Sequence, residues 1–232
     1  MRETFAERHV VVTGAGGGLG PAVVAHLVGA GATCHLPLRR RDDGLATRLA
    51  GPKVTLVPGV DLTEEASVVR FYGELPPLWA SIHLAGGYAG GAFVDTSLAD
   101  LRRQLEINLV TAFLCCREAV RALRRTGQGG RLLNVTSRGA LEPGGGAIAY
   151  AAAKSGVTAL TRALAKELKA DGILVNAIAP ATIDTPDNRA AMPRADFERW
   201  AKPAELAETI AFLVAPENTV TTGAIVPTYG RE

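Results

Sequence analysis

The stretch that decides the fold of this chain is Thr13-Gly14-Ala15-Gly16-Gly17-Gly18-Leu19-Gly20. A β-branched run, Val10 to Val12, precedes it and predicts a strand. The residues from Leu19 to Gly29 carry apolar side chains at helical spacing and predict a helix. Strand, glycine turn and helix in this order favour dinucleotide binding, because the turn brings phosphate oxygens to the backbone N–H groups and positive dipole end of the helix.

Three glycines of this turn have separate expected roles. Gly14 permits a tight turn, Gly18 lets the backbone approach a pyrophosphate, and Gly20 lets the helix pack closely. The alternative is a flexible glycine turn that holds no ligand, and the flanking strand and helix argue against it.

Strands and helices alternate along the whole chain. Strands are predicted at 10–12, 33–38, 54–60, 80–85, 131–136, 173–178 and 224–226, and helices at 19–29, 48–49, 64–75, 98–125, 150–170 and 204–214. Because the strand segments are apolar on both faces, they predict a parallel sheet covered by helices on each side. We therefore expect one α/β domain over residues 1–232, a doubly wound Rossmann-type sheet, with glycine-rich loops at 86–91 and 144–146 and a polar lid at 181–200.

Composition excludes several classes of protein. With 47% hydrophobic residues and a net charge of +2, the chain is typical of a globular domain with no nucleic-acid or membrane partner. Its three cysteines cannot form a disulfide framework, which favours a reducing, cytoplasmic location. The N-terminal sequence is too poor in aliphatic residues for a signal peptide, and no stretch approaches the roughly 20 apolar residues of a membrane span. The four histidines lack metal-ligand spacing, so we expect no metal site.

The residues after the second strand bear on the choice of cofactor. An acidic residue there would bond the ribose 2′-hydroxyl of NAD, but this chain has Arg39-Arg40-Arg41 and no carboxylate until Asp42. A guanidinium suits a 2′-phosphate, so NADP(H) is preferred and NAD(H) remains possible. The alternative is that these arginines form only a solvated turn.

A second group of residues carries the chemistry. Tyr150 and Lys154 are four residues apart in a predicted helix, which places the phenol and the ammonium on one face, one turn apart. Ser137 ends the fifth strand at the sheet edge where ligands bind. An adjacent cation lowers the pKa of a phenol, so we expect Lys154 to bring the pKa of Tyr150 toward working pH.

Together these motifs resemble the short-chain dehydrogenase/reductase family. The resemblance covers nearly the whole chain and rests on Thr13 to Gly20, Asp61, Ala85-Gly86, Asn108, Ser137, Tyr150, Lys154, Asn176 to Pro180 and Thr222 to Val226. It implies an NAD(P)-dependent enzyme that reduces a ketone or oxoacyl carbonyl to a secondary alcohol, or catalyses the reverse. It also implies a small-molecule substrate and assembly as a homodimer or homotetramer.

The resemblance implies roles for individual residues. Tyr150 would be the general acid or base, Lys154 would also bond the nicotinamide ribose, Ser137 would hold the substrate oxygen, and Asn108 would keep a water in a proton relay. The implied cofactor-binding residues are Gly14, Gly17, Gly18, Leu19, Gly20, Arg39, Asp61, Leu62, Ala85, Gly86, Tyr150, Lys154, Pro180, Ile183 and Thr185.

The sequence departs from the family pattern at two places. His83-Leu84 stands where the family has two asparagines, and Ala181 stands where it has glycine. Two other functions stay open: a dinucleotide-binding sensor or scaffold without turnover, and an enzyme like dihydropteridine reductase, whose loop resembles residues 85–91. Phe197 and Trp200 are expected either to cap the substrate cleft or to anchor the lid or an interface.

Overall fold

The computed structural model describes residues 4–49 and 51–232. Its strands are β1 (His9–Thr13), β2 (Thr33–Leu38), β3 (Val54–Pro58), β4 (Leu78–His83), β5 (Gly130–Val135), β6 (Ile173–Pro180) and β7 (Ile225–Thr228). Its α-helices are α1 (Gly20–Gly29), α2 (Asp43–Arg48), α3 (Glu65–Gly73), α4 (Leu98–Leu105), α5 (Thr111–Arg124), α6 (Arg138–Leu141), α7 (Ile148–Glu167), α8 (Pro186–Ala191) and α9 (Pro203–Val214). Residues 1–3 lie outside the described residues. They belong to the N-terminal stretch in which we expected no signal peptide.

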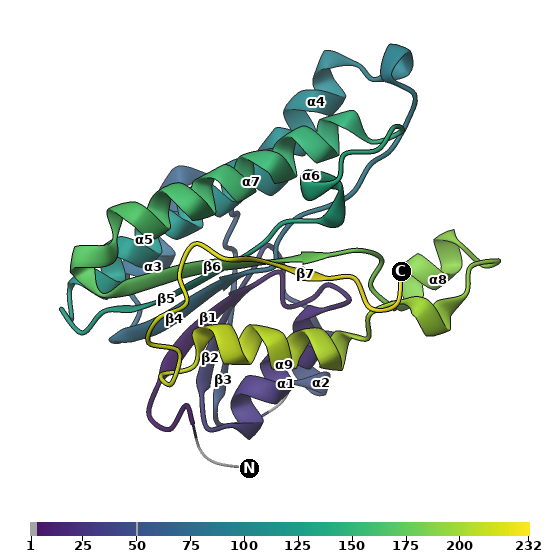
Figure 1. Ribbon diagram of the computed structural model, residues 1–232. Helices are drawn as coiled ribbons and strands as arrows, with labels where there is room; N and C mark the ends of the chain where they lie inside the picture. The colour runs from purple at the N-terminus through teal and green to yellow at the C-terminus, as the bar shows by residue number, and fades with distance from the viewer. Residues whose placement is uncertain (1–3, 50) are drawn as a thin grey trace.

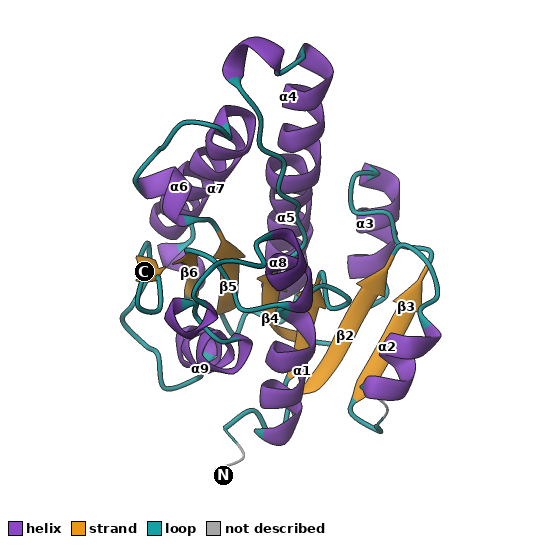
Figure 2. Ribbon diagram, turned by 90° about the vertical axis from the view of Figure 1, so that its right-hand side faces the viewer, coloured by secondary structure: helices purple, strands orange, loops and turns teal. Residues whose placement is uncertain are grey.

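The strands form one parallel sheet in the order β3-β2-β1-β4-β5-β6-β7. Helices α1, α2 and α9 cover one face, and α3, α5 and α7 cover the other (Figures 1 and 2). A separate apolar cluster fills the space under each helical layer: Val23, Leu27 and Ile210 belong to one, and Phe71 and Leu123 to the other. The predicted doubly wound fold is confirmed.

The strand order reverses between β1 and β4, and this reversal positions the site. The chain runs outward from β1 to β2 and β3 and then returns to β4 on the other side of β1. The register pairs Thr13 with His83, so the carboxyl ends of β1 and β4 lie level with each other. In open α/β sheets the loops after such strands diverge and leave a crevice for a ligand.

Two element predictions were wrong in detail. The expected helix over 98–125 is divided by a π-helical turn, Glu106–Val110. Helix α2 begins five residues before its predicted position, because Asp42 accepts a hydrogen bond from the Leu45 N–H (2.8 Å) and caps it. The expected lid is partly helical: Thr185 caps α8, and a short 3₁₀ helix, Phe197–Arg199, follows.

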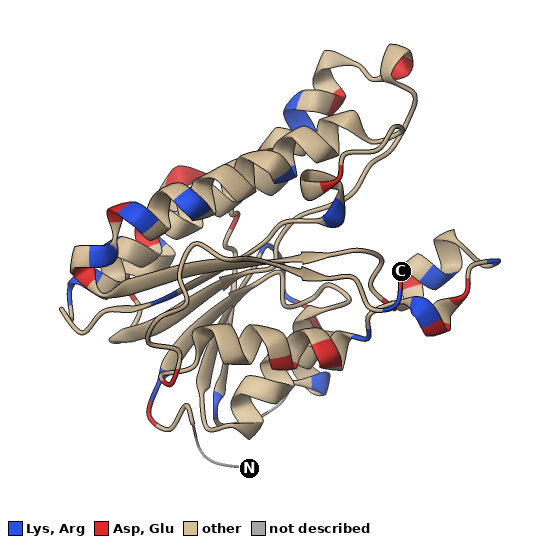
Figure 3. Ribbon diagram, in the orientation of Figure 1, with Lys and Arg blue, Asp and Glu red and all other residues tan. Residues whose placement is uncertain are grey.

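Charged residues of both signs are interspersed over the helices (Figure 3). Within residues 4–49 and 51–232, no helix is long and apolar enough to cross a membrane.

Candidate active site

A cavity of about 300 Å³ lies at the carboxyl edge of the sheet. The predicted residues that line it are Gly14, Gly17, Gly18, Leu19, Gly20, Gly86, Asn108, Ser137, Tyr150, Lys154, Pro180, Ile183 and Thr185. Eight further residues line it that were not among the predicted site residues: Leu84, Gly87, Tyr88, Val135, Thr136, Ala181, Asp187 and Asn188. Residues separated by up to 174 positions in the chain, from Gly14 to Asn188, therefore share one cavity.

The glycine turn forms one side of the cavity. Gly14 has a φ of 69°, and a Cβ there would lie 2.6 Å from the Ala85 backbone nitrogen, so only glycine fits between β1 and the end of β4. A Cβ at Gly20 would collide with the Ala15 backbone, which agrees with the expected close packing of α1. At Gly18 a Cβ would collide with the side chain of Thr185. The lack of a side chain at this position therefore makes room for Thr185, in addition to the expected approach of the backbone to a pyrophosphate.

Ser137, Tyr150 and Lys154 meet on the other side. Ser137 follows β5, and α7 carries Tyr150 and Lys154 one turn apart. The Lys154 Nζ lies 5.9 Å from the Tyr150 ring centroid and donates a hydrogen bond to the Val135 carbonyl oxygen (2.9 Å). The Ser137 Oγ is buried and has no hydrogen-bond partner among the described residues. Buried hydroxyls normally have a partner, so this oxygen is available to a ligand.

The electrostatics of Tyr150 differ from our expectation. Burial raises the pKa of the Tyr150 phenol, and Tyr88 adds to the rise. The nearby Ser137 hydroxyl offsets part of it, although its Oγ does not reach hydrogen-bond geometry with any described residue. Burial also lowers the pKa of the Lys154 ammonium to about 8. The expected lowering of the Tyr150 pKa by Lys154 was therefore wrong for this structure, because burial dominates and the ammonium is directed to Val135. At neutral pH the phenol stays protonated, which suits a proton donor.

Asn108 lies in the π turn between α4 and α5. Its Oδ1 accepts a hydrogen bond from the Gly87 N–H (3.1 Å), and its Nδ2 donates to the carbonyl oxygens of Gly87 (2.9 Å) and Gln104 (3.1 Å). These contacts hold the loop after β4 against the helix, and a Cβ at Gly86 would lie 2.5 Å from the Asn108 Oδ1. The Asn108 side chain therefore fixes a loop, and its part in a water relay stays a prediction.

Four predicted cofactor residues, Arg39, Asp61, Leu62 and Ala85, are not among those lining this cavity. Arg39 and Asp61 follow β2 and β3, and the Arg39 Nε lies 3.3 Å from the Asp61 Oδ2. The Arg39 side chain is 76% exposed. Leu62 packs against the apolar cluster under α3 and α5, and the Ala85 N–H donates to the Thr13 Oγ1 (3.3 Å).

His83, at one of the two places where the sequence departs from the family pattern, has a hydrogen-bond partner at each ring nitrogen. Its Nδ1 lies 2.8 Å from the Asn134 Oδ1, and its Nε2 lies 2.9 Å from the Ser81 Oγ. The Tyr72 hydroxyl contacts Ser81 (2.8 Å), and the Asn134 Nδ2 donates to the Thr161 Oγ1 (2.9 Å). The chain of bonds is satisfied throughout when Nδ1 carries the proton and His83 is neutral. Burial lowers the pKa of His83 to about 4, which favours that form.

Aromatic residues lie both inside and outside the cavity. Phe197 and Trp200 contact each other (centroids 4.9 Å apart) but do not line the cavity; Trp200 is buried and anchors the segment before α9. Tyr88 does line it, with its ring edge-to-face against Tyr150 at 5.1 Å. The signal for Tyr88 was its place in the glycine-rich loop after β4.

Cys115 and Cys116 are buried packing residues on α5. The fold brings the Cys116 Sγ to 3.4 Å from the His83 Nδ1, but burial raises the pKa of this thiol to about 12. A thiol in that state is a poor nucleophile. In the described part of the chain, no group of three or more His, Cys, Asp or Glu side chains is arranged to hold a metal ion.

Residues 8–195 match the model of the short chain dehydrogenase family. The chain belongs to this family. It is 36% identical to cis-4-hydroxycyclohexanecarboxylate dehydrogenase of Sinomonas cyclohexanicum over 99% of this chain and 98% of that protein. It is 30% identical to 2-dehydro-3-deoxy-L-rhamnonate dehydrogenase (NAD(+)) of a Sphingomonas species over 97% of this chain and 95% of that protein.

Solved structures agree with this membership. A short-chain type dehydrogenase/reductase from Mycobacterium ulcerans superposes with a TM-score of 0.90 at 27% identity, covering 98% of this chain and 90% of that one. The protein is therefore a short-chain dehydrogenase, an NAD(P)-dependent oxidoreductase.

Proposed function

We propose that this short-chain dehydrogenase is an NADP(H)-dependent enzyme that reduces a ketone or oxoacyl carbonyl to a secondary alcohol, or catalyses the reverse. The observation that carries the proposal is the buried Ser137 Oγ, which has no partner among the described residues and faces the cavity that Tyr150 and Lys154 line. A carbonyl or alcohol oxygen would supply the missing hydrogen bond.

The residues present fit a nicotinamide dinucleotide. The glycine turn at the N-terminus of α1 leaves no room for side chains at Gly14 and Gly20, and Ile183 and Thr185 extend the lining of the cavity beside it. Backbone N–H groups of the turn and the positive end of α1 would hold the pyrophosphate. The bound nicotinamide supplies or accepts a hydride.

Side chains of this protein carry out the proton transfer. Tyr150, protonated at neutral pH because burial raises its pKa, donates to the developing alkoxide oxygen, while Ser137 orients that oxygen. Lys154 is positively charged below its pKa of about 8 and stabilises the phenolate that remains. In the oxidation direction Tyr150 acts as the base.

Arg39 supports a preference for NADP(H). It follows β2 and its side chain is largely exposed, so its guanidinium is open to a 2′-phosphate. The Asp61 carboxylate 3.3 Å away orients it but competes for it. Because one relative is named as an NAD(+) enzyme, the preference for NADP(H) over NAD(H) is to be measured directly.

The substrate class is inferred from relatives and from the cavity. One relative is named for a hydroxylated cyclohexane and the other for a sugar acid, which supports a secondary alcohol or its ketone as the reacting group. The ring of Tyr88 stands beside Tyr150 and offers an apolar wall to the rest of the molecule.

A homodimer or homotetramer is proposed through α5 and α7. Phe113 on α5 is 47% exposed, and Ala159 and Ala163 on α7 are also exposed instead of packing on the sheet. Small side chains allow close helix contact between two copies. Cys34, Cys115 and Cys116 are free and buried, which supports a reducing, cytoplasmic location.

The test is a fluorescence titration with NADPH and NADH, followed by turnover with a panel of cyclic ketones and oxoacyl thioesters. Arg39→Ala should weaken NADPH binding by about tenfold and leave NADH binding unchanged, since one charge-assisted contact to the phosphate is lost. Arg48→Ala is the matched control, because Arg48 lies in the last turn of α2 and is also exposed.

Equal affinity for both nucleotides in the unsubstituted protein would overturn the NADP(H) preference. Binding without turnover of any carbonyl or alcohol would instead favour the sensor or scaffold reading. Tyr150→Phe should abolish turnover and keep nucleotide binding.

A further inference from the structure

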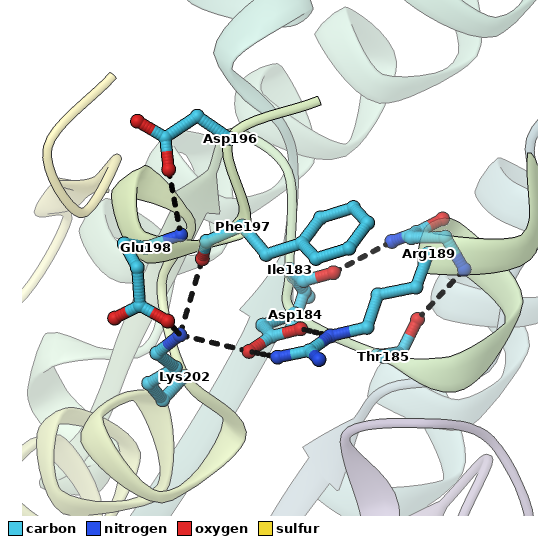
Figure 4. Close-up of polar contacts among 9 residues, drawn as sticks. Ile183, Asp184, Thr185, Arg189, Asp196, Phe197, Glu198 and Lys202 are labelled. Atoms are coloured by element: carbon cyan, nitrogen blue, oxygen red, sulfur yellow. Dashed lines mark hydrogen bonds and ion pairs between the residues drawn. The ribbon is translucent and has the colours of Figure 1, made fainter. Parts of the chain in front are cut away.

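The segment after β6 contains an ion-pair cluster centred on Asp184 (Figure 4). The two Asp184 carboxylate oxygens accept hydrogen bonds from the Arg189 guanidinium at 2.5 and 2.8 Å. The Lys202 ammonium donates to the same carboxylate at 2.9 Å and to the Phe197 carbonyl oxygen at 3.1 Å. The Asp184 side chain is only 8% exposed.

The cluster joins parts of the chain that are separate in sequence. Arg189 belongs to α8, whereas Lys202 directly precedes α9. Backbone contacts link the same two parts of the chain. The Asp184 N–H donates a hydrogen bond to the Ala201 carbonyl oxygen (2.9 Å), and Ile183 forms an isolated β-bridge with Ala201. Arg189 also lies over the Phe197 ring, 4.7 Å from its centroid. The contacts of Asp184 and Ile183 thus join the beginning of the segment 183–202 to its end.

Asp184 stands between two residues that line the cavity. Its neighbours Ile183 and Thr185 both face the cavity, and the Thr185 side chain lies directly against Gly18 of the glycine turn. Asn188 holds both neighbours, since its Nδ2 donates to the Ile183 carbonyl oxygen (2.8 Å) and its N–H donates to the Thr185 Oγ1 (3.2 Å). Asp184 is therefore joined through the backbone to both residues of the wall that faces the glycine turn.

We propose that Asp184 is a positioning residue for the cofactor: its pairing with Arg189 and Lys202 holds Ile183 and Thr185 against the glycine turn in the free protein. The pairing makes this wall rigid before a nucleotide arrives, so binding does not bear the full cost of ordering a loop. An exposed single ion pair contributes little, but this carboxylate is buried and has two cationic partners from different elements. Arg189 and Lys202 hold the pKa of Asp184 well below its usual range, so the cluster persists at acidic pH.

The proposal rests on nucleotide binding in the cavity and concerns affinity, with the chemical step left to Tyr150. The test compares Asp184→Asn, Lys202→Gln and the control Asp171→Asn. Asp171 pairs with Arg124 (2.7 Å) at the far end of α5, so its substitution also removes an Asp–Arg pair. Lys202→Gln is the milder variant, since its side chain is 35% exposed, and it serves if Asp184→Asn fails to fold.

Two measurements are made on each variant. The dissociation constant for NADPH and NADH should rise by about tenfold or more in Asp184→Asn, with kcat at saturating nucleotide within about threefold, because a positioning residue changes binding more than chemistry. Without nucleotide, trypsin should cleave Asp184→Asn after the exposed Arg194 faster than it cleaves the unsubstituted protein at the same residue. Saturating nucleotide should slow that cleavage. Asp171→Asn should change neither readout.

Unchanged nucleotide affinity in Asp184→Asn and Lys202→Gln would overturn the proposal, even if both variants unfold more easily. A fall in kcat with unchanged affinity would also overturn it. If the unsubstituted protein binds neither nucleotide, the proposed function fails, whereas the cleavage rate at Arg194 without nucleotide still reports whether Asp184 orders the segment.

Discussion

Replacing His83 with leucine should destabilise the protein through the polar network under the sheet. The imidazole contacts Ser81 at 2.9 Å and Asn134 at 2.8 Å, and all three side chains are buried. Leaving a buried polar group without its partner costs about 1–3 kcal/mol. Ser81 keeps Tyr72, and Asn134 keeps a weak contact with the Cys116 thiol at 3.4 Å, so we expect a total loss of about 2–4 kcal/mol.

Urea denaturation measures this loss, with His26→Leu as the control. His26 is partly exposed on the last turn of α1, and its substitution should cost no more than about 0.5 kcal/mol. A loss in His83→Leu as small as in the control would refute the network argument. A changed denaturant slope in either variant would indicate a change in the compactness of the denatured or native state, or a loss of two-state unfolding.

The pH dependence tests the same network separately. The folded-state pKa of His83 is lowered to about 4, so its contribution is complete above the unfolded pKa of about 6.5 and is lost as pH falls toward 4. The slope is at most about 1.4 kcal/mol per pH unit, which gives a loss of about 2 kcal/mol between about pH 6.5 and pH 5. The stability gap between the unsubstituted protein and His83→Asn should narrow by that amount. His35, whose pKa burial also lowers to about 4, is present in both proteins and cancels. A gap that does not vary with pH would contradict the neutral His83.

Further predictions concern catalysis and the glycine turn. Because burial raises the pKa of Tyr150, kcat/KM for alcohol oxidation should increase as pH rises above neutrality, and a flat profile would contradict this. Ketone reduction should decline above pH of about 8, where Lys154 loses its charge, and pH profiles of kcat/KM with Lys154→Arg should lack that decline. Gly14→Ala should cost about 1–3 kcal/mol in urea denaturation, since its φ is 69° and a Cβ would lie 2.6 Å from the Ala85 nitrogen. Its control, Gly51→Ala, should be nearly neutral, because a Cβ there would meet no atom of the described residues within 4 Å.

Local sequence determined the order of the elements and the pairing of Tyr150 with Lys154. Helical spacing puts those two side chains on one face of α7 wherever that helix lies, and a β-branched run followed by glycines predicts strand and turn without knowledge of the rest. The doubly wound fold followed because apolar strands that alternate with helices must be covered on both faces. The glycine positions followed because only glycine accepts a backbone as tight as that of Gly14.

Tertiary structure decided what depends on contacts between distant segments. The π turn at Asn108 could not be read from the periodicity of residues 98–125, because its side chain bonds Gly87, which precedes the helix by a loop. The pKa of Tyr150 was predicted with the wrong sign, since spacing shows the nearby cation but not the burial that outweighs it.

The same limit applies to substitutions and ion pairs. A histidine in place of an amide at position 83 has no fixed meaning until Ser81 and Asn134 are brought to its two ring nitrogens. Asp184 and Lys202 are polar residues in a weakly periodic segment, and only the folded chain joins them through one carboxylate. Periodicity records which face of an element is buried, whereas the partner of a buried polar group is set by the packing of whole elements.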